Sequence, residues 1–368
     1  MRQAPERIER LPQQYFTALL ASVAAAAAAE GEPLVDLGRG NPEVGPPPHV
    51  VEALAASAAR PDVHGYSPFS GLPALKEAIA ARYRDVYGVE LDPAREVAVL
   101  PGTKTGLMEF ALCTVDRGDT IVLPDPGYPD YFSAVALAGA RVASFSGFDI
   151  TGDAMYLNFP TNPTATAAPG GVFEDAVAWA HRHDAWVMHD FAYGDLVFDG
   201  RRPHSFLETD GARDVGIELF SMSKSYGMAG WRLGFALGNA ELIHRIENLQ
   251  EHAFAGIFRP VQEAGIAALT GPQDSVEERR ATYERRRDRA LVALAGVEAR
   301  SEGTFFVWFR LPDDLGVDRL LAEHRVALAP GEGFGIRGAG WARLSLAVTD
   351  DVLELGLERL RHAFAQSA

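Results

Sequence analysis

A lysine in a serine- and glycine-rich loop, flanked by two strand-length apolar runs, constrains this chain more than any other feature. The apolar runs span 216–220 and 233–237, and the lysine between them is Lys224. A loop that joins two buried strands is an unusual place for a side chain that normally stays exposed. Either the loop lies on the surface with an ordinary lysine, or the lysine has a chemical role inside a site.

The side chains around Lys224 suit a ligand that carries a phosphate. Ser221 and Ser223 supply hydroxyl groups, Arg232 supplies a guanidinium group, and the glycines leave backbone amides accessible. Phosphate binding needs this set of donors. A partly desolvated lysine beside a second cation has a lowered pKa, so its neutral amine can attack a carbonyl group. A phosphate and an aldehyde together describe pyridoxal phosphate, a cofactor that forms a Schiff base with lysine.

The whole segment 221–234 resembles the pyridoxal-phosphate lysine motif of the class I/II aminotransferases, which share fold type I. The match continues through the sequence Ala-Gly-Trp-Arg-Leu-Gly at 229–234. Four other motifs elsewhere in the chain agree with the family, and they occur in the expected order. The resemblance covers nearly the whole chain. Strands that alternate with helices through the middle of the chain argue independently for an α/β sheet covered on both faces.

The resemblance implies an α/β architecture with two domains. We expect a mainly parallel seven-stranded sheet between helices, together with a smaller α+β domain. The large pyridoxal-phosphate domain should span 46–270, and the small domain should combine 1–45 with 271–368. The chain has 368 residues. This length is enough for two domains of roughly 150 residues each.

The segment 96–115 reads as a strand, a glycine turn and a helix, a layout that points free backbone N–H groups at an anion. The resemblance places the cofactor phosphate at Gly102 and at the amides of Thr103 and Lys104. It also assigns a role to Tyr66, because a tyrosine here in the family reaches across a dimer interface to the neighbour's phosphate. The resemblance therefore implies an obligate homodimer whose sites are built from two chains.

Four residues match the family's contacts to the cofactor ring. Tyr128 follows an apolar strand and matches the stacking residue, whereas Tyr131 is expected to be a packing residue. Asn162 and Tyr193 match the donors to the ring oxygen. Asp190 ends a buried strand, where a carboxylate is costly without a partner, and the protonated pyridine nitrogen is such a partner.

Two features depart from the family pattern. Ala165 replaces the glycine of the family's Asn-Pro-Thr-Gly turn, which puts the turn geometry in doubt rather than the role of Asn162. Between two predicted strands, the segment 145–154 is shorter than the excursion that family members usually have, which includes a helix. We expect a different local surface there and no loss of chemistry.

The ends of the chain supply the predicted substrate contacts. Arg343 matches the arginine that clamps the substrate α-carboxylate in a bidentate fork, a role for which lysine is poorly suited. Gly40 lies beside the same carboxylate in the family, and Asn162 contacts the substrate as well. Arg39 stands where relatives often carry an uncharged residue, and the hypothesis is that it faces the substrate side chain or an acidic amino donor. An exposed surface arginine is the simpler alternative.

These roles imply an aminotransferase that moves the α-amino group between an L-amino acid and a 2-oxo acid. Lys224 forms the Schiff base and then transfers a proton as general base and acid, and Asp190 and Tyr193 complete the catalytic set. The chain is most similar to the branch with the methionine-salvage aminotransferases, which act on 4-methylthio-2-oxobutanoate and related oxo acids. A carbon–sulfur β-lyase and a specialised biosynthetic enzyme remain open alternatives, because they use the same constellation.

Composition excludes several other classes. The net charge of −16 and the absence of a basic stripe disfavour nucleic-acid binding, including a regulator that fuses this fold to a DNA-binding segment. A single cysteine, Cys113, rules out an internal disulfide and suits a reducing cytoplasm. The histidines at 183, 189 and 204 lack metal-ligand spacing, so we expect no metal site. The alanine-rich segment 13–30 predicts a helix that is too short and too weakly apolar to span a membrane.

Overall fold

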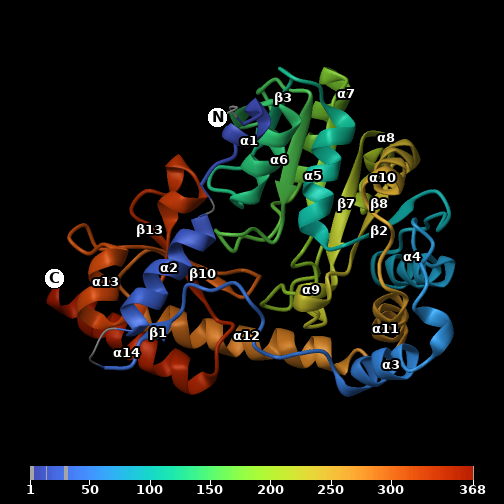
Figure 1. Cartoon of the computed structure of the whole chain (residues 1–368). Coiled ribbons are helices and arrows are strands. Elements are labelled where there is room, and N and C mark those ends of the chain that lie inside the picture. Colours follow the sequence, from blue (N-terminus) through green and yellow to red (C-terminus); the bar gives the residue numbers. More distant parts are fainter. Residues whose placement is uncertain (1–3, 14, 29–31, 368) are drawn as a thin grey trace.

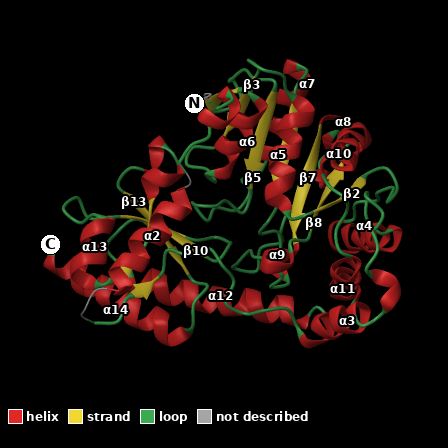
Figure 2. Cartoon of the chain, viewed as in Figure 1, coloured by secondary structure: helices red, strands yellow, loops and turns green. Residues whose placement is uncertain are grey.

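The computed structural model describes residues 4–13, 15–28 and 32–367. A seven-stranded sheet forms the centre of its larger part (Figures 1 and 2). The strands in sheet order are β2 (Val97–Leu100), β8 (Gly234–Gly238), β7 (Gly216–Ser221), β6 (Trp186–Asp190), β5 (Ala154–Asn158), β3 (Thr120–Leu123) and β4 (Arg141–Ser144). Only β8 runs antiparallel to its neighbours β2 and β7. The expected mainly parallel seven-stranded sheet is therefore confirmed.

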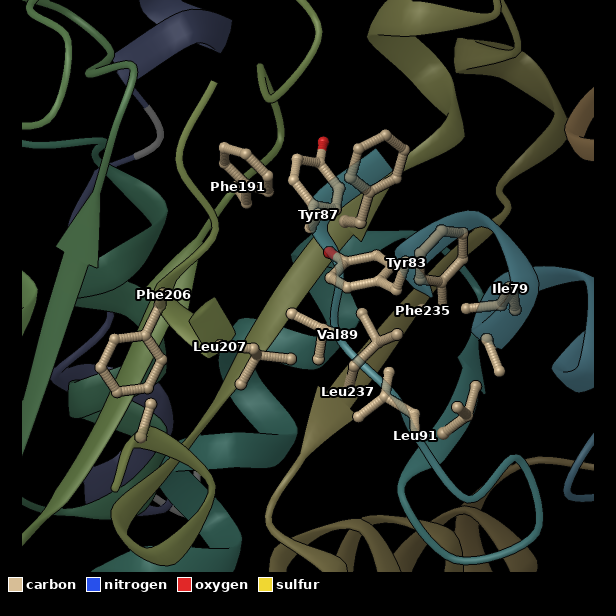
Figure 3. Packing of buried hydrophobic residues seen from close by; sticks show 14 of the residues in the cluster. Ile79, Tyr83, Tyr87, Val89, Leu91, Phe191, Phe206, Leu207, Phe235 and Leu237 are labelled. Atoms are coloured by element: carbon tan, nitrogen blue, oxygen red, sulfur yellow. The ribbon is translucent and has the colours of Figure 1, made fainter. Parts of the chain in front are cut away.

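Helices cover both faces of this sheet, because alternate residues of each strand point to opposite sides. In β2, Val97 and Val99 pack into one apolar cluster, whereas Ala98 and Leu100 pack into another. The first cluster includes residues of α3 (Pro48–Ala58), α4 (Pro73–Tyr87), α7 (Val172–His183), α8 (Ala212–Val215) and α11 (Arg259–Thr270). The second includes residues of α5 (Thr103–Thr114), α6 (Asp130–Ala138) and α10 (Ala240–Ala253). Figure 3 shows part of the first cluster, in which Tyr83 of α4 packs near Phe235 of β8.

A smaller antiparallel sheet lies beside the large one (Figure 1). Its strands in order are β12 (Ala329–Pro330), β13 (Trp341–Ser345), β10 (Phe306–Arg310) and β9 (Ala299–Arg300). The strand β1 (Val35–Asp36) pairs in parallel with β11 (Val326–Ala327), so the N-terminal segment joins the C-terminal part of the chain. Helices α13 (Val317–His324) and α14 (Asp350–Gln366) pack against this part.

The long helix α12 (Asp274–Ala293) runs from the large part to the small one (Figure 1). The strands of the large sheet all lie between residues 97 and 238, whereas the small sheets use 35–36 and 299–345. We propose the domain limits expected from the sequence, 46–270 for the large domain and 1–45 with 271–368 for the small one, on this basis.

The N-terminal region begins with α1 (Glu6–Glu9) and α2 (Tyr15–Ala28). The helix predicted at 13–30 is thus present, although its predicted end at residues 30–31 lies outside the described residues. No helix within the described ranges is long and apolar enough to cross a membrane. Residues 145–153, between β4 and β5, form bends and turns without a helix.

Candidate active site

A cavity of about 600 Å³ lies between the carboxyl-end edge of the large sheet and the small domain. Parallel strands place their sites at this edge, because the loops that follow them converge there. The cavity brings together most of the residues predicted from the sequence. These are Arg39, Gly40, Thr103, Lys104, Tyr128, Asn162, Asp190, Tyr193, Ser221, Ser223, Lys224, Arg232 and Arg343. Gly102 lies next to the cavity, behind Arg232.

Lys224 lies on α9 (Met222–Ser225), a single helical turn at the carboxyl end of β7 (Figure 1). Its Nζ donates a hydrogen bond to the carbonyl oxygen of Gly40 at 3.1 Å. Desolvation lowers the pKa of the amine to about 8, and the positive charges of Arg343 and Arg232 add to this shift. The negative charge of Asp190 opposes it. A large fraction of the amine is therefore neutral, and so nucleophilic, near pH 8.

The lowered pKa of Lys224 predicts how fast the cofactor-free protein captures pyridoxal phosphate as the pH changes. Only the neutral amine attacks an aldehyde, so the rate should rise with pH and level off above about 8. An ordinary lysine would keep the rate rising toward pH 10.4 or so. Stopped-flow absorbance at a series of pH values measures this profile, and a midpoint near 10 would show that the cavity does not desolvate the amine.

Asp190 is the last residue of β6, is buried and lines the cavity. Its Oδ2 accepts a hydrogen bond from the hydroxyl of Tyr131 at 2.7 Å, and its Oδ1 accepts one from the amide of Ala192 at 3.2 Å. Burial raises the pKa of the Asp190 carboxyl, and these two hydrogen bonds oppose that shift. A cationic ring nitrogen would compensate the cost of the buried carboxylate, as the sequence predicts.

The expectation that Tyr131 is merely a packing residue is wrong. The side chain is fully buried, and its hydroxyl donates a hydrogen bond to the Asp190 carboxylate. A buried phenol normally finds an acceptor, so burial of this tyrosine was the available signal. The identity of the acceptor was not accessible, because Asp190 lies 59 residues away in the sequence.

One end of the cavity forms a cradle for an anion. Gly102 precedes α5, and no side chain caps the first N–H groups of that helix, at Thr103 and Lys104. The Lys104 side chain instead pairs with Asp130, at 3.0 Å between Nζ and Oδ1. A Cβ at Gly102 would lie 2.1 Å from a guanidinium nitrogen of Arg232, so only glycine lets the arginine approach the helix start. Free amides and a guanidinium group, with the hydroxyls at 221 and 223, fit a phosphate.

The opposite side of the cavity is formed by Arg343 on β13. Its guanidinium is buried and lies 3.9 Å from the ring centroid of Phe306 and 4.8 Å from that of Phe334. One of its terminal nitrogens, Nη1, donates to Asn162 Oδ1 at 2.7 Å, and Nη2 donates to the Gly38 carbonyl oxygen at 3.1 Å. The aromatic rings fix the plane of the guanidinium group, which suits a bidentate clamp on a carboxylate.

The turn that carries Asn162 keeps an ordered conformation despite the missing glycine. Ala165 adopts the left-handed φ of 54° for which glycine is usual. Its amide donates to the Thr161 carbonyl oxygen at 2.8 Å, and its own carbonyl accepts from Glu302 at 2.7 Å. Contacts on both sides therefore hold the alanine in this conformation. With Oδ1 facing Arg343, the Nδ2 group of Asn162 is the donor that remains for a ring oxygen.

Arg39 lies at the mouth of the cavity, and its side chain is 61% exposed. Its Nε pairs with Asp36 Oδ2 at 2.6 Å, and both residues line the cavity. Arg39 is therefore largely exposed and also lines the cavity, and its role toward a substrate side chain or an acidic donor remains a prediction.

The sequence analysis missed one wall of the cavity. Leu19, Leu20 and Val23 of α2 line the cavity, and Tyr15 anchors the start of that helix through a 2.9 Å hydrogen bond to the Pro330 carbonyl oxygen. The alanine-rich sequence of α2 predicts a helix without indicating where it packs. An apolar side of a helix near the chain end was the only signal.

Tyr66 does not line the cavity, and it is 89% exposed. Three further aromatic side chains are exposed. Phe69 belongs to the same segment as Tyr66, whereas Phe254 and Phe258 flank the loop between α10 and α11. The His64 and Phe258 rings lie 6.0 Å apart, which links the Tyr66 segment to the start of α11. The role of Tyr66 at a partner's site remains a prediction.

Comparison with known proteins agrees with this geometry. A family model described as "Aminotransferase class I and II" matches residues 32–360. The chain is 42% identical to the L-glutamine–4-(methylsulfanyl)-2-oxobutanoate aminotransferase of Bacillus subtilis, over 96% of this chain and 94% of the relative. It is 38% identical to the glutamate-pyruvate aminotransferase AlaC of Escherichia coli, over 97% and 93%. Substrate-bound BacF from Bacillus subtilis superposes with a TM-score of 0.92 at 35% identity, over 99% and 98% of the two chains.

Proposed function

The chain belongs to the class I and II aminotransferases, which depend on pyridoxal phosphate, and we propose that it pairs an apolar 2-oxo acid with an acidic amino donor. The transfer of an α-amino group between an amino acid and a 2-oxo acid follows from the family. The choice of substrates rests on one observation, the lining of the cavity. Its α2 wall is apolar, and Arg39, which is paired with Asp36, lies at its mouth.

Each proposed catalytic role follows from a contact or a charge. Bound pyridoxal phosphate supplies the aldehyde that takes up the amino group and the ring that withdraws electrons from the substrate α-carbon. Lys224 Nζ removes the proton from that α-carbon and later returns one, because its amine is largely neutral near pH 8. Arg343 binds the α-carboxylate and Asp190 holds the positive ring nitrogen. Asn162 and Tyr193 donate to the ring oxygen.

The α2 wall supports an apolar side chain on one of the two substrates. Leu19, Leu20 and Val23 offer aliphatic surface at the cavity, and a side chain buried against it gains roughly 0.8 kcal/mol per CH₂ group. A thioether chain is long, unbranched and apolar, so it suits such a wall. The relative from Bacillus subtilis is named for a 2-oxo acid of this type, 4-(methylsulfanyl)-2-oxobutanoate.

A half-reaction screen tests the proposed substrates. The protein loaded with pyridoxal phosphate is mixed with single amino acids, and loss of the absorbance of the lysine-linked cofactor reports each productive donor. We expect methionine and glutamate to react, and lysine or serine to react at least tenfold more slowly. Pyruvate and ammonia formed from cystathionine, without loss of this absorbance, would instead establish the β-lyase alternative.

Arg39 should select for the acidic donor. We expect Arg39→Gln to raise KM for glutamate and 2-oxoglutarate by about fivefold, since a partly exposed ion pair contributes roughly 1 kcal/mol. The KM for methionine should not change. Arg310→Gln is a matched control, because that side chain is 60% exposed and lies outside this cavity. Equal KM values for glutamate in both variants would rule out the role of Arg39.

We propose a homodimer, supported by the exposed aromatic side chains Tyr66, Phe69, Phe254 and Phe258. Four such rings at the surface of neighbouring segments would be covered by a second copy. Light scattering should give twice the chain mass of 39.7 kDa. Tyr66→Phe should leave this mass unchanged and weaken pyridoxal-phosphate binding by about tenfold, as expected for one lost hydrogen bond to a charged group. A monomer, or unchanged cofactor affinity, would contradict the shared site.

The same proposal includes a cytoplasmic location and a role in amino-acid biosynthesis. The single cysteine, Cys113, supports the cytoplasmic location, because disulfides are rare in proteins of a reducing compartment. The names of the related enzymes, which include LL-diaminopimelate aminotransferases, support the second.

A further inference from the structure

We propose that Tyr131 is a positioning residue that holds the Asp190 carboxylate in its ionised form and keeps the shared proton on the cofactor's ring nitrogen. The proposal rests on the role proposed for Asp190 above. It concerns a hydroxyl that does not line the cavity and that acts through the carboxylate. The hydrogen bond between the Tyr131 hydroxyl and Asp190 Oδ2, at 2.7 Å, carries the argument.

The surroundings of Tyr131 leave its hydroxyl a single orientation. The side chain lies in the first turn of α6 and is fully buried. Its ring makes edge-to-face contacts with Tyr128 on one side, at 5.6 Å between centroids, and with Tyr156 on the other, at 5.4 Å. The ring therefore cannot turn away from Asp190 without disturbing both neighbours.

Tyr131 can only donate to Asp190. Burial, and then the negative charge of Asp190, raise the pKa of the phenol well above its usual value of 10.0, so it stays protonated at any working pH. Other titratable groups around the carboxylate are Tyr128, Tyr193 and Lys224 on the cavity side. His189 precedes Asp190 in β6, so its side chain points to the opposite face of the sheet. There its Nδ1 lies 2.8 Å from Glu218 Oε2. The hydroxyl of Tyr131, in contrast, donates directly to Asp190 Oδ2.

A permanent donor changes where a shared proton resides. A hydrogen bond to a carboxylate stabilises the anion and makes it a weaker base. The proton between Asp190 and a pyridine ring then stays on the ring nitrogen, and the ring stays cationic. Without the phenol hydroxyl the buried carboxylate becomes more basic and takes the proton. The ring then loses its charge, withdraws electrons less strongly and leaves the lysine-linked nitrogen more basic.

Tyr131→Phe and Tyr156→Phe form a matched pair that tests this proposal. Both substitutions remove one buried hydroxyl, and that of Tyr156 donates to the Leu107 carbonyl oxygen at 2.7 Å without contacting Asp190. In the protein loaded with pyridoxal phosphate, a pH titration of the absorbance follows protonation of the lysine-linked nitrogen. We expect Tyr131→Phe to move the midpoint upward by about half to one pH unit, since a net hydrogen-bond contribution of about 1 kcal/mol corresponds to roughly 0.7 pH unit. The cofactor dissociation constant, measured by fluorescence on the same variants, should rise about tenfold.

Tyr156→Phe should lower the melting temperature as much as Tyr131→Phe and leave the midpoint unchanged. An unchanged midpoint in Tyr131→Phe, or equal shifts in both variants, would show that Tyr131 is only structural. If Tyr131→Phe fails to fold, fluorotyrosine at position 131 keeps the hydroxyl as a stronger donor. The midpoint should then move downward, and its failure to move would overturn the proposal. A wild-type protein with no lysine-linked absorbance would instead overturn the proposed site as a whole.

Discussion

Lys224→Ala abolishes amino-group transfer, with an expected fall in kcat on the order of 10⁴-fold. The amine of Lys224 lies in the cavity and donates to the Gly40 carbonyl oxygen at 3.1 Å, and its lowered pKa suits both attack on an aldehyde and proton transfer. Alanine removes both abilities and leaves the anion cradle and Arg343 intact. The variant should therefore still bind pyridoxal phosphate, although without a covalent link.

The small number of lysines allows the site of covalent attachment to be identified directly. The sequence contains three lysines, Lys76, Lys104 and Lys224. After reduction with borohydride, peptide mass spectrometry should find the cofactor on the peptide with Lys224 in the wild-type protein and on no peptide in Lys224→Ala. Lys104→Arg is the control, because it preserves the backbone amide and the contact with Asp130. Covalent cofactor on residue 104 in the wild-type protein would contradict the assignment.

Asp190→Asn should lower kcat by roughly 10²- to 10³-fold, the loss expected when one member of a buried charge pair is removed. The amide keeps the shape of the side chain and can still accept from Tyr131, but it cannot balance a cationic ring nitrogen. The KM for amino acids should change little, because Arg343, the proposed clamp for the substrate carboxylate, lies on the other side of the cavity. Steady-state kinetics with methionine and glutamate measure both values.

Glu109→Gln provides the control for Asp190→Asn. Glu109 is a buried carboxyl group on α5, its pKa is raised to about 7 by burial, and it accepts hydrogen bonds from Gln250 outside the cavity. Its neutralisation should affect stability and leave kcat within twofold of the wild type. A similar loss of kcat in both variants would mean that Asp190 contributes only to folding.

Much of the fold follows from local sequence patterns. The sequence pattern predicts one helix over residues 350–366 and another over 240–254, and the structure has α14 at Asp350–Gln366 and α10 at Ala240–Ala253. Asn239 explains the second start, because its side chain accepts from the amides of Glu241 and Leu242. Period and capping act over a few residues, so a single sequence is sufficient to locate such elements.

The cavity was partly predictable for a related reason. Tyr128, Asp190 and Lys224 follow apolar strands, and parallel strands bring the residues after their carboxyl ends to one edge of the sheet. The α2 wall and the bond from Tyr131 to Asp190 were not predictable in this way. Both depend on how a helix packs against distant parts of the chain.

Residue types at strand ends and helix starts indicated the groups proposed for the cavity: an amine, an anion cradle and a carboxylate. Which of these groups touch one another depends on the tertiary packing. Arg343 meets Asn162 across 181 residues of sequence, and Lys224 meets Gly40 across 184. Local propensities set the elements within a few residues, whereas contacts at this separation depend on the packing of both domains around a common core.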